Sequence, residues 1–139
     1  MSNIKELLLI DDDQICNFCL QNLLDNCPGF KANVRTALNG QEAMDIIEEH
    51  WYNTDESKQQ TKLIFLDLNM PVMDGFEFLD TYSKHPLSKS SEVVIYVLSS
   101  SLNISDQEKA LGYPTVQEYL TKPFKLEQLQ VILDRHQTP

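Results

Sequence analysis

Short hydrophobic runs alternate along the chain with longer segments in which hydrophobic residues recur every three or four positions. The short runs predict β-strands at residues 4–10, 30–36, 63–66, 93–98 and 119–120. The longer segments predict amphipathic helices, one after each strand, at residues 16–27, 43–51, 76–82, 105–111 and 126–133. Residues 54–62 are polar throughout and are expected to form a surface loop. Such alternation predicts an α/β fold, a parallel sheet with helices on both faces.

Polar residues mark the starts of several predicted helices. Asn39, Asp74 and Ser105 are each followed three residues later by Glu, which is the spacing of an N-terminal capping pair. Asp13 is expected to cap the first helix in a similar way. These polar residues are therefore assigned to helix capping.

The residues that directly follow the predicted strands carry most of the candidate chemistry. In parallel α/β sheets, ligands bind beyond the carboxyl ends of the strands. The residues placed there are Asp11, Asp12, Asp13, Asp67, Asn69, Ser99 and Lys122. Carboxylates gathered at one sheet edge repel one another unless a cation is present, and Mg²⁺ suits such oxygen ligands. Lys122 and Ser99 could bind an incoming anion, so the set favours a phosphoryl group transferred to the Asp67 carboxylate.

Four segments carry a family resemblance: LLLIDDD, LIFLDLNMPVMDG, VIYVLSSS and EYLTKPF. In their order, approximate spacing and flanking hydrophobic residues they resemble the receiver domain of two-component response regulators, the CheY-like family. The resemblance extends over nearly the whole chain. It implies a doubly wound, flavodoxin-like sheet of five parallel strands in the order 2-1-3-4-5, with helices on both faces.

The resemblance also implies roles for individual residues. Asp67 resembles the phosphoacceptor, and Mg²⁺ would be held by Asp11, Asp12, Asp67 and the backbone carbonyl of Asn69. The residues that would bind the phosphoryl group or relay its presence are Ser99, Ser100, Lys122 and Tyr119. The Lys122-Pro123 bond stands where the family has a cis peptide, and Asn69 and Ser101 stand where family members tune dephosphorylation.

A signalling role follows from the same resemblance. Residues 1–139, with a core at about 4–136, are expected to form a single receiver domain without an output domain. A histidine kinase or a histidine phosphotransfer protein would donate the phosphoryl group. The expected chemistry is limited to self-catalysed phosphotransfer and autodephosphorylation, so the protein would not be an enzyme. The surface that binds an unknown protein target or a second copy of the chain would consist of residues 105–111, 119 and 126–133.

The charge of the chain narrows its partners further. Eleven Lys and Arg residues against 21 Asp and Glu residues give a net charge of −10. Nucleic-acid affinity depends on neutralising phosphates with basic side chains, so nucleic acid is not an expected partner. No basic cluster would attract an anionic membrane, and no apolar run approaches the ~20 residues of a membrane-spanning helix. A cytoplasmic location is expected.

Three other functions remain open at this point. Asp11-x-Asp13 after a strand resembles the nucleophile motif of haloacid dehalogenase-type phosphatases. A flavodoxin-like flavin binder would share the fold, although an acidic loop after the first strand would repel its phosphate. A receiver used only for protein interaction is the third.

The cysteines raise a separate question. Cys16 and Cys19 form a C-x-x-C pattern, for which redox or zinc chemistry is the alternative. Together with Cys27 they recur at helical spacing with leucines, so we expect core packing.

Overall fold

The computed structural model describes residues 4–27, 30–52, 61–70, 73–90, 92–100, 103–122 and 124–136. Five parallel strands form a single sheet in the order β2-β1-β3-β4-β5. They are β1 (Ile4–Ile10), β2 (Asn33–Ala37), β3 (Thr61–Asp67), β4 (Val93–Ser99) and β5 (Val116–Thr121). The predicted fold class and strand order are confirmed.

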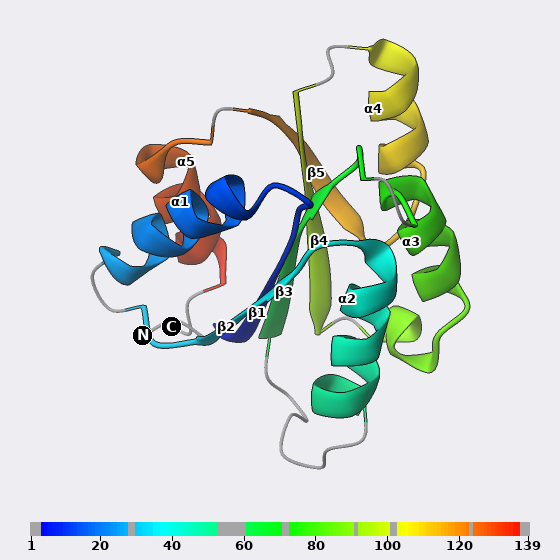
Figure 1. The fold of residues 1–139 in the computed structure, drawn as a ribbon, viewed down its shortest axis with the longest axis horizontal. Coiled ribbons are helices and arrows are strands. Elements are labelled where there is room, and N and C mark those ends of the chain that lie inside the picture. The colour runs from blue at the N-terminus through cyan, green and yellow to red at the C-terminus, as the bar shows by residue number, and fades with distance from the viewer. Residues whose placement is uncertain are drawn as a thin grey trace.

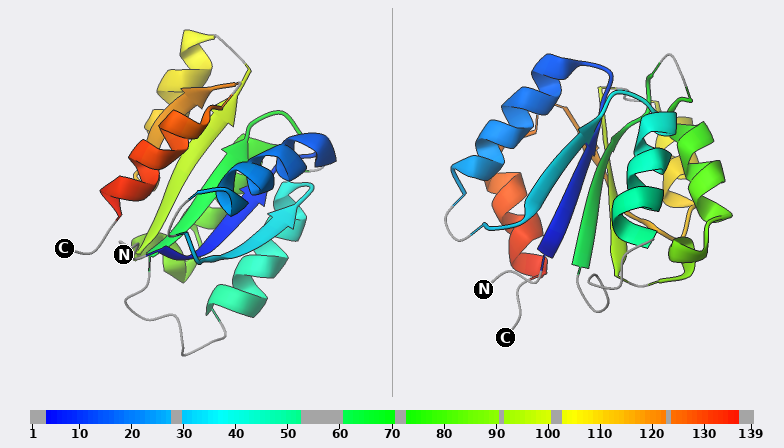
Figure 2. Two further views of the ribbon diagram at one scale, coloured as in Figure 1. Left: turned by 90° about the vertical axis from the view of Figure 1, so that its left-hand side faces the viewer. Right: turned by 60° about the horizontal axis from the view of Figure 1, so that its bottom comes forward.

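Helices cover both faces of this sheet (Figures 1 and 2). One face carries α1 (Gln14–Asp25) and α5 (Leu126–Arg135), which lie side by side. The other carries α2 (Gly40–Ile46), continued by the π-helical η1 (Ile47–Tyr52), then α3 (Gly75–Ser83) and α4 (Ile104–Leu111). A short 3₁₀ helix, η2 (Pro86–Lys89), follows α3. No helix within the described ranges is long and apolar enough to cross a membrane.

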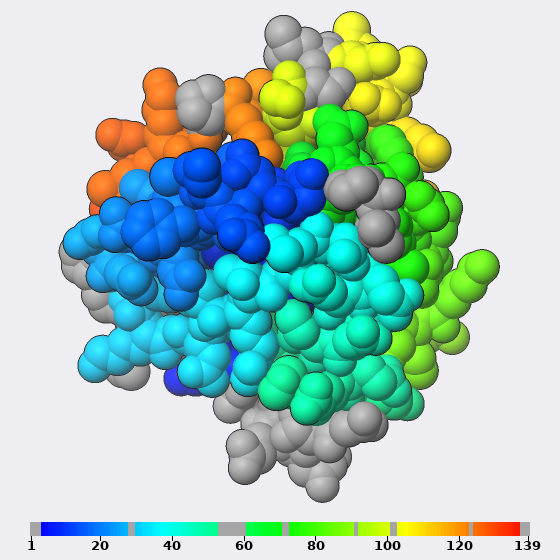
Figure 3. Space-filling model, viewed as in Figure 1, coloured from blue at the N-terminus to red at the C-terminus, as the bar shows by residue number. Residues whose placement is uncertain are grey.

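Two hydrophobic cores follow from this layering, because successive residues of a strand point to opposite faces. Leu7 and Leu9 of β1 belong to the core under α1 and α5. Leu8 and Ile10 belong to the core under α2, α3 and α4. All four leucine and isoleucine side chains are at most 1% exposed, which is why the central strands are continuously hydrophobic. In the space-filling view, residues of α1, β2 and α2 form a continuous surface across the edge of the sheet that β2 forms (Figure 3).

The capping predictions are confirmed at three helices and wrong at one. Asp13, Asn39 and Asp74 each accept a hydrogen bond from a backbone N–H in the first turn of α1, α2 and α3. The helix α4 instead begins after Asn103, whose side chain accepts from the N–H of Ser105. Asn is as good a cap as Ser, and the backbone is already helical at Ser105.

Three strand starts also differ from the prediction, and that of β5, at Val116, is three residues earlier than predicted. β2 begins at Asn33, three residues later than predicted. β3 begins at Thr61, so Lys62 lies inside the sheet, where it is 1% exposed, and not in the predicted surface loop. Its Nζ lies 3.7 Å from a carboxylate oxygen of Glu92, which compensates part of the cost of burial. The remaining loop residues, 53–60, lie outside the described part of the chain.

The cysteine prediction is only partly confirmed. Cys27 is buried at 7% exposure and packs in the core under α1 and α5. Cys16 is half-buried and Cys19 is exposed, and all three thiols are free. The helical spacing is right, but α1 is turned so that Leu20 and Leu24 fill the core and the first two cysteines lie toward its edge.

Candidate functional site

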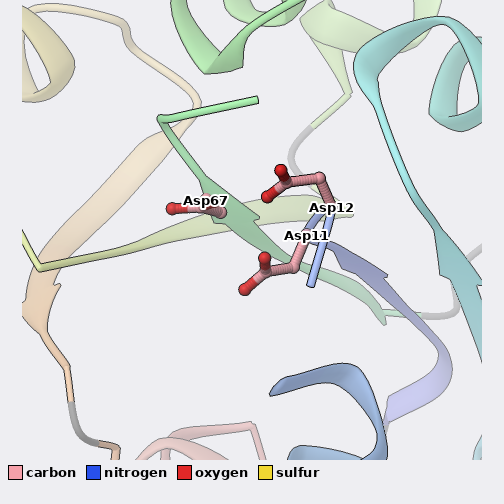
Figure 4. Close-up of side chains that lie close together, drawn as sticks. All are labelled: Asp11, Asp12 and Asp67. Atoms are coloured by element: carbon pink, nitrogen blue, oxygen red, sulfur yellow. The ribbon is translucent and has the colours of Figure 1, made fainter. Parts of the chain in front are cut away.

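The carboxyl ends of β1 and β3 bring three carboxylates together (Figure 4). One carboxylate oxygen from each of Asp11, Asp12 and Asp67 lies within 4.8 Å of the others. We call these three residues the acidic cluster. Asp11 and Asp67 are buried, each 7% exposed, while Asp12 lies at the surface. Adjacent parallel strands end at the same edge, so the predicted juxtaposition of these side chains is observed.

Lys122, which follows β5, reaches into this cluster. Its Nζ lies 2.7 Å from Oδ2 of Asp11 and 3.7 Å from Oδ1 of Asp67. Burial alone would lower the pKa of Lys122, but the hydrogen bond to Asp11 and the charges of Asp67 and Asp11 raise it above its ordinary value. The lysine is therefore charged and neutralises part of the acidic cluster.

The environment of Asp67 favours its protonated form. Burial, followed by the charge of Asp11, raises the pKa of Asp67 to about 6, although Lys122 and a backbone hydrogen bond from Asn69 oppose the shift. The buried carboxylate of Asp67 is therefore ionised at neutral pH at a cost in free energy. A cation bound beside Asp67 would stabilise the ionised carboxylate and so offset this free-energy cost.

Local hydrogen bonds fix Asp11 at the end of β1. Its backbone N–H donates to the carbonyl of Ala37, and its Oδ1 accepts from the N–H of Asp13 at 2.9 Å. The buried side chain of Asn17 donates to the carbonyl of Asp11 at 3.0 Å. Asn17 was not among the predicted site residues; its only signal in the sequence is an amide on the otherwise hydrophobic inner side of the first helix.

Gly75 allows the segment after β3 to turn close to Asp67. A Cβ at Gly75 would lie 2.6 Å from the Cα of Leu68 and 2.8 Å from the carbonyl oxygen of Asp67. The N–H of Gly75 donates to the carbonyl of Leu68 at 3.0 Å, which closes this turn. Glycine at this position thus lets α3 begin against the strand that carries Asp67.

Ser99 and Tyr119 lie on the two neighbouring strands β4 and β5. Ser99 is fully buried, and its carbonyl accepts from the backbone N–H of Lys122 at 2.9 Å. Tyr119 is half-buried and packs against the core under α2, α3 and α4. Ser100 and Asn69 are exposed beside the strand ends. Ser101 and Pro123, and with Pro123 the predicted cis peptide, lie outside the described residues.

Comparison with known proteins assigns the family. The family model described as "Response regulator receiver domain" matches residues 7–134. The chain belongs to this family. Among solved structures, this receiver is similar to a two-component response regulator from Cytophaga hutchinsonii, with 28% identity and a TM-score of 0.79 over 95% of this chain and 96% of that one. It is also similar to the phosphorylated cyanobacterial phytochrome response regulator RcpA, with 29% identity and a TM-score of 0.72 over 95% and 90% of the two chains.

Curated relatives include both short and long proteins. A probable chemotaxis protein CheY from Rhizobium etli is 27% identical over 129 residues, which cover 93% of this chain and 89% of that protein. The response regulator ARR10 of Arabidopsis thaliana is 29% identical over 126 residues, which cover 91% of this chain but 20% of that protein. The receiver thus spans about a fifth of the length of the plant regulator it matches.

Family membership gives the general function. Receiver domains of two-component systems are phosphorylation-dependent signalling switches, not true enzymes, and they bind Mg²⁺ at an acidic pocket. The phosphatase alternative is not supported, because Asp13 lies outside the acidic cluster and its carboxylate caps α1 through the N–H of Ile15. The flavin-binder alternative is likewise not supported by the family.

Proposed function

We propose that this receiver accepts one phosphoryl group on Asp67 in a Mg²⁺-dependent reaction and transmits the change to a protein partner. The observation that carries the proposal is the position of Asp67, buried in the acidic cluster and 3.7 Å from Lys122. A nucleophilic carboxylate, an acidic cation site and a mobile ammonium are the three parts that this chemistry needs. The phosphorylated state named for RcpA, a relative with 29% identity, supports the same reading.

The oxygen-rich end of the sheet would hold the ion. Carboxylates of Asp11, Asp12 and Asp67 and the backbone carbonyl of Asn69 would coordinate Mg²⁺, which suits a set of hard oxygen ligands. The bound ion would neutralise the negative charge that gathers on the phosphoryl oxygens during transfer. The donor set fits the ion, because the cluster holds three carboxylates against the single ammonium of Lys122.

Transfer would proceed from a phosphohistidine donor. A carboxylate oxygen of Asp67 attacks the phosphorus, an O–P bond forms and the N–P bond of the donor breaks. The electron pair stays on the imidazole nitrogen, which then takes a proton from water. Lys122 would move from Asp11 to an oxygen of the new phosphoryl group, and its hydrogen bond to that oxygen would replace its bond to Asp11. A histidine kinase or a histidine phosphotransfer protein is the proposed donor.

Readout would begin at Ser99 and Tyr119. The hydroxyl of Ser99, together with Ser100, would donate to the phosphoryl oxygens, and Tyr119 would turn into the space that Ser99 leaves. The remodelled surface is that of α4, β5 and α5. It already presents apolar side chains, with Ile104, Leu111 and Val131 exposed by 68%, 50% and 52%. This supports docking of a protein target or of a second copy there.

Phosphorylation by a small donor tests the proposal. Incubation with acetyl phosphate and Mg²⁺ should add the mass of one phosphoryl group, measured on the intact protein. Asp67→Asn should abolish this addition because the amide is not nucleophilic, whereas Asp25→Asn, at the exposed end of α1, should behave like wild type. Undiminished incorporation in Asp67→Asn would contradict the assigned acceptor. No incorporation in wild type would favour an interaction-only receiver.

A further inference from the structure

A half-open apolar pocket lies beside the acidic cluster, on the α1 and α5 face of the sheet. Its volume is about 170 Å³. Its apolar lining includes Phe65 of β3, Leu98 of β4, Leu20 of α1 and Phe124, which follows β5. The rings of Phe65 and Phe124 lie with centroids 5.6 Å apart and planes at 50°, so they present an aromatic corner to the pocket.

Two small side chains of α1 leave this space open. Cys16 and Cys19 both line the pocket; the first is half-buried and the second is exposed. A thiol occupies less volume than the side chains of leucine or methionine, so these positions do not fill the gap between α1 and Phe124. Burial and a hydrogen bond to Asp13 raise the pKa of Cys16 to about 11, so the thiol of Cys16 carries no charge at neutral pH.

Part of the pocket lining is charged. Asp11, Asp67 and Lys122 belong to it, which gives two carboxylates to one ammonium. Since Lys122 is held 2.7 Å from Asp11, the carboxylate of Asp67 is the less fully compensated of the two. The lining of the pocket therefore combines aromatic and other uncharged side chains with a net negative charge.

We infer that this pocket binds a small aromatic cation, with its ring against Phe65 and Phe124 and its ammonium group at Asp67 and Asp11. An apolar cavity of about 150 Å³ accepts one benzene ring, so the volume suits a single ring. An anionic head group would be repelled by the same carboxylates. Such a ligand would place its charge where a metal ion would bind and would cover Asp67, so it should inhibit phosphorylation. This inhibition rests on the proposed function, but binding of the ligand to the pocket does not.

Benzylamine is the probe, titrated into the metal-free protein and followed by amide NMR. The expected result is a saturable shift of the amides of α1 and of the segment after β5, with a dissociation constant in the millimolar range expected for so small a ligand. Benzoate, of similar size and opposite charge, should bind at least about tenfold more weakly. Mg²⁺ should raise the apparent dissociation constant of benzylamine.

Filling the pocket is the decisive control. Cys16→Met and Cys19→Leu should each weaken benzylamine binding by about tenfold or more while the spectra stay those of a folded protein. Ile15→Leu, on the exposed side of α1 and outside the pocket, should bind like wild type. Absence of shifts at these amides, equal binding of benzoate, or undiminished binding in both filled variants would overturn the inference. A protein that binds benzylamine but takes no phosphoryl group from acetyl phosphate would contradict the proposed function and leave this site in place.

Discussion

The side-chain nitrogen of Lys122 lies 2.7 Å from a carboxylate oxygen of Asp11, although 111 positions separate the two residues in the chain. In the metal-free protein this ion pair compensates the charge of one of the two buried carboxylates of the acidic cluster. The same ammonium lies 3.7 Å from Asp67. Lys122 is thus placed to shift from one carboxylate to the other when the charge on Asp67 changes.

Removal of Lys122 should destabilise the metal-free protein. In Lys122→Met, the carboxylates of Asp11 and Asp67 stay buried without their counter-charge, which should cost about 1 to 3 kcal/mol because the lysine is partly exposed. Urea denaturation in EDTA measures this loss. Mg²⁺ should restore more stability to the variant than to wild type. Lys31→Met, at an exposed position, should change little; an equally small effect in Lys122→Met would mean that the ion pair contributes nothing.

Magnesium should stabilise the wild-type fold by mass action. At an Mg²⁺ concentration about ten times the dissociation constant, the gain is about 1.4 kcal/mol. Asp12→Ala should lose most of this gain because one ligand is removed, while its metal-free stability should be unchanged or slightly higher, since Asp12 is exposed and repels its neighbours. Thermal melts with and without Mg²⁺ measure both effects, with Asp25→Ala as the control. A full Mg²⁺ response in Asp12→Ala would remove Asp12 from the ligand set.

The raised pKa of Asp67 predicts a pH-dependent stability. Because the pKa is about 6 in the folded protein and 3.8 is its ordinary value, the folded state binds the proton more tightly than the unfolded state. The protonated side chain of Asp67 therefore contributes to the stability of the folded state at acidic pH, and this contribution is lost as the pH rises through about 6. Asp67→Asn should remove this loss, so it should stabilise the metal-free protein by about 1 to 3 kcal/mol at pH 7.5 and by less at pH 5.

Urea denaturation in EDTA at the two pH values provides the measurement. Asp25→Asn, which is exposed, should show no such difference between them. If Asp67→Asn were destabilised equally at both values, the carboxylate of Asp67 would not be under the electrostatic strain that its surroundings indicate.

Ser99 should be needed for readout but not for phosphorylation. In Ser99→Ala the carboxylates of the acidic cluster and Lys122 remain, so incorporation from acetyl phosphate should persist. The hydroxyl that we propose links the phosphoryl group to Tyr119 is lost. Amide NMR with beryllofluoride, a phosphoryl mimic, should show shifts in β5 and α5 of wild type that are strongly reduced in Ser99→Ala. Shifts confined to the strand ends in wild type would contradict this switch.

The sequence by itself determined the fold and the location of the site. Buried parallel strands are hydrophobic on both faces, so the runs that end at Asp11 and Asp67 could be recognised without any partner strand. The family motifs then implied the strand order and the residues of the site. Helix caps such as Asp74 could be predicted because they depend only on contacts within four residues.

Boundaries that depend on partners were not predictable in this way. Lys62 lies within β3 because the sheet pairs it with Val93 and its amine meets Glu92, and neither contact has a local signal. The π-helical turn that ends α2 brings the indole N–H of Trp51 to the carboxylate of Glu6 at 3.1 Å, a bond across 45 residues. A hydrophobic pattern could indicate that Trp51 is buried, but not the turn that buries it.

Only the tertiary structure decided how the charges and the free space are distributed around Asp67. The pairing of Lys122 with Asp11, the raised pKa of Asp67 and the pocket beside Cys16 all depend on how β5 and α1 pack against β1 and β3. A sequence pattern fixes which side of a helix is hydrophobic, but not the rotation and distance at which that helix rests on the sheet. Distances between side chains from different elements set both the electrostatic energies and the volume left unfilled, and these arise only when the elements pack together.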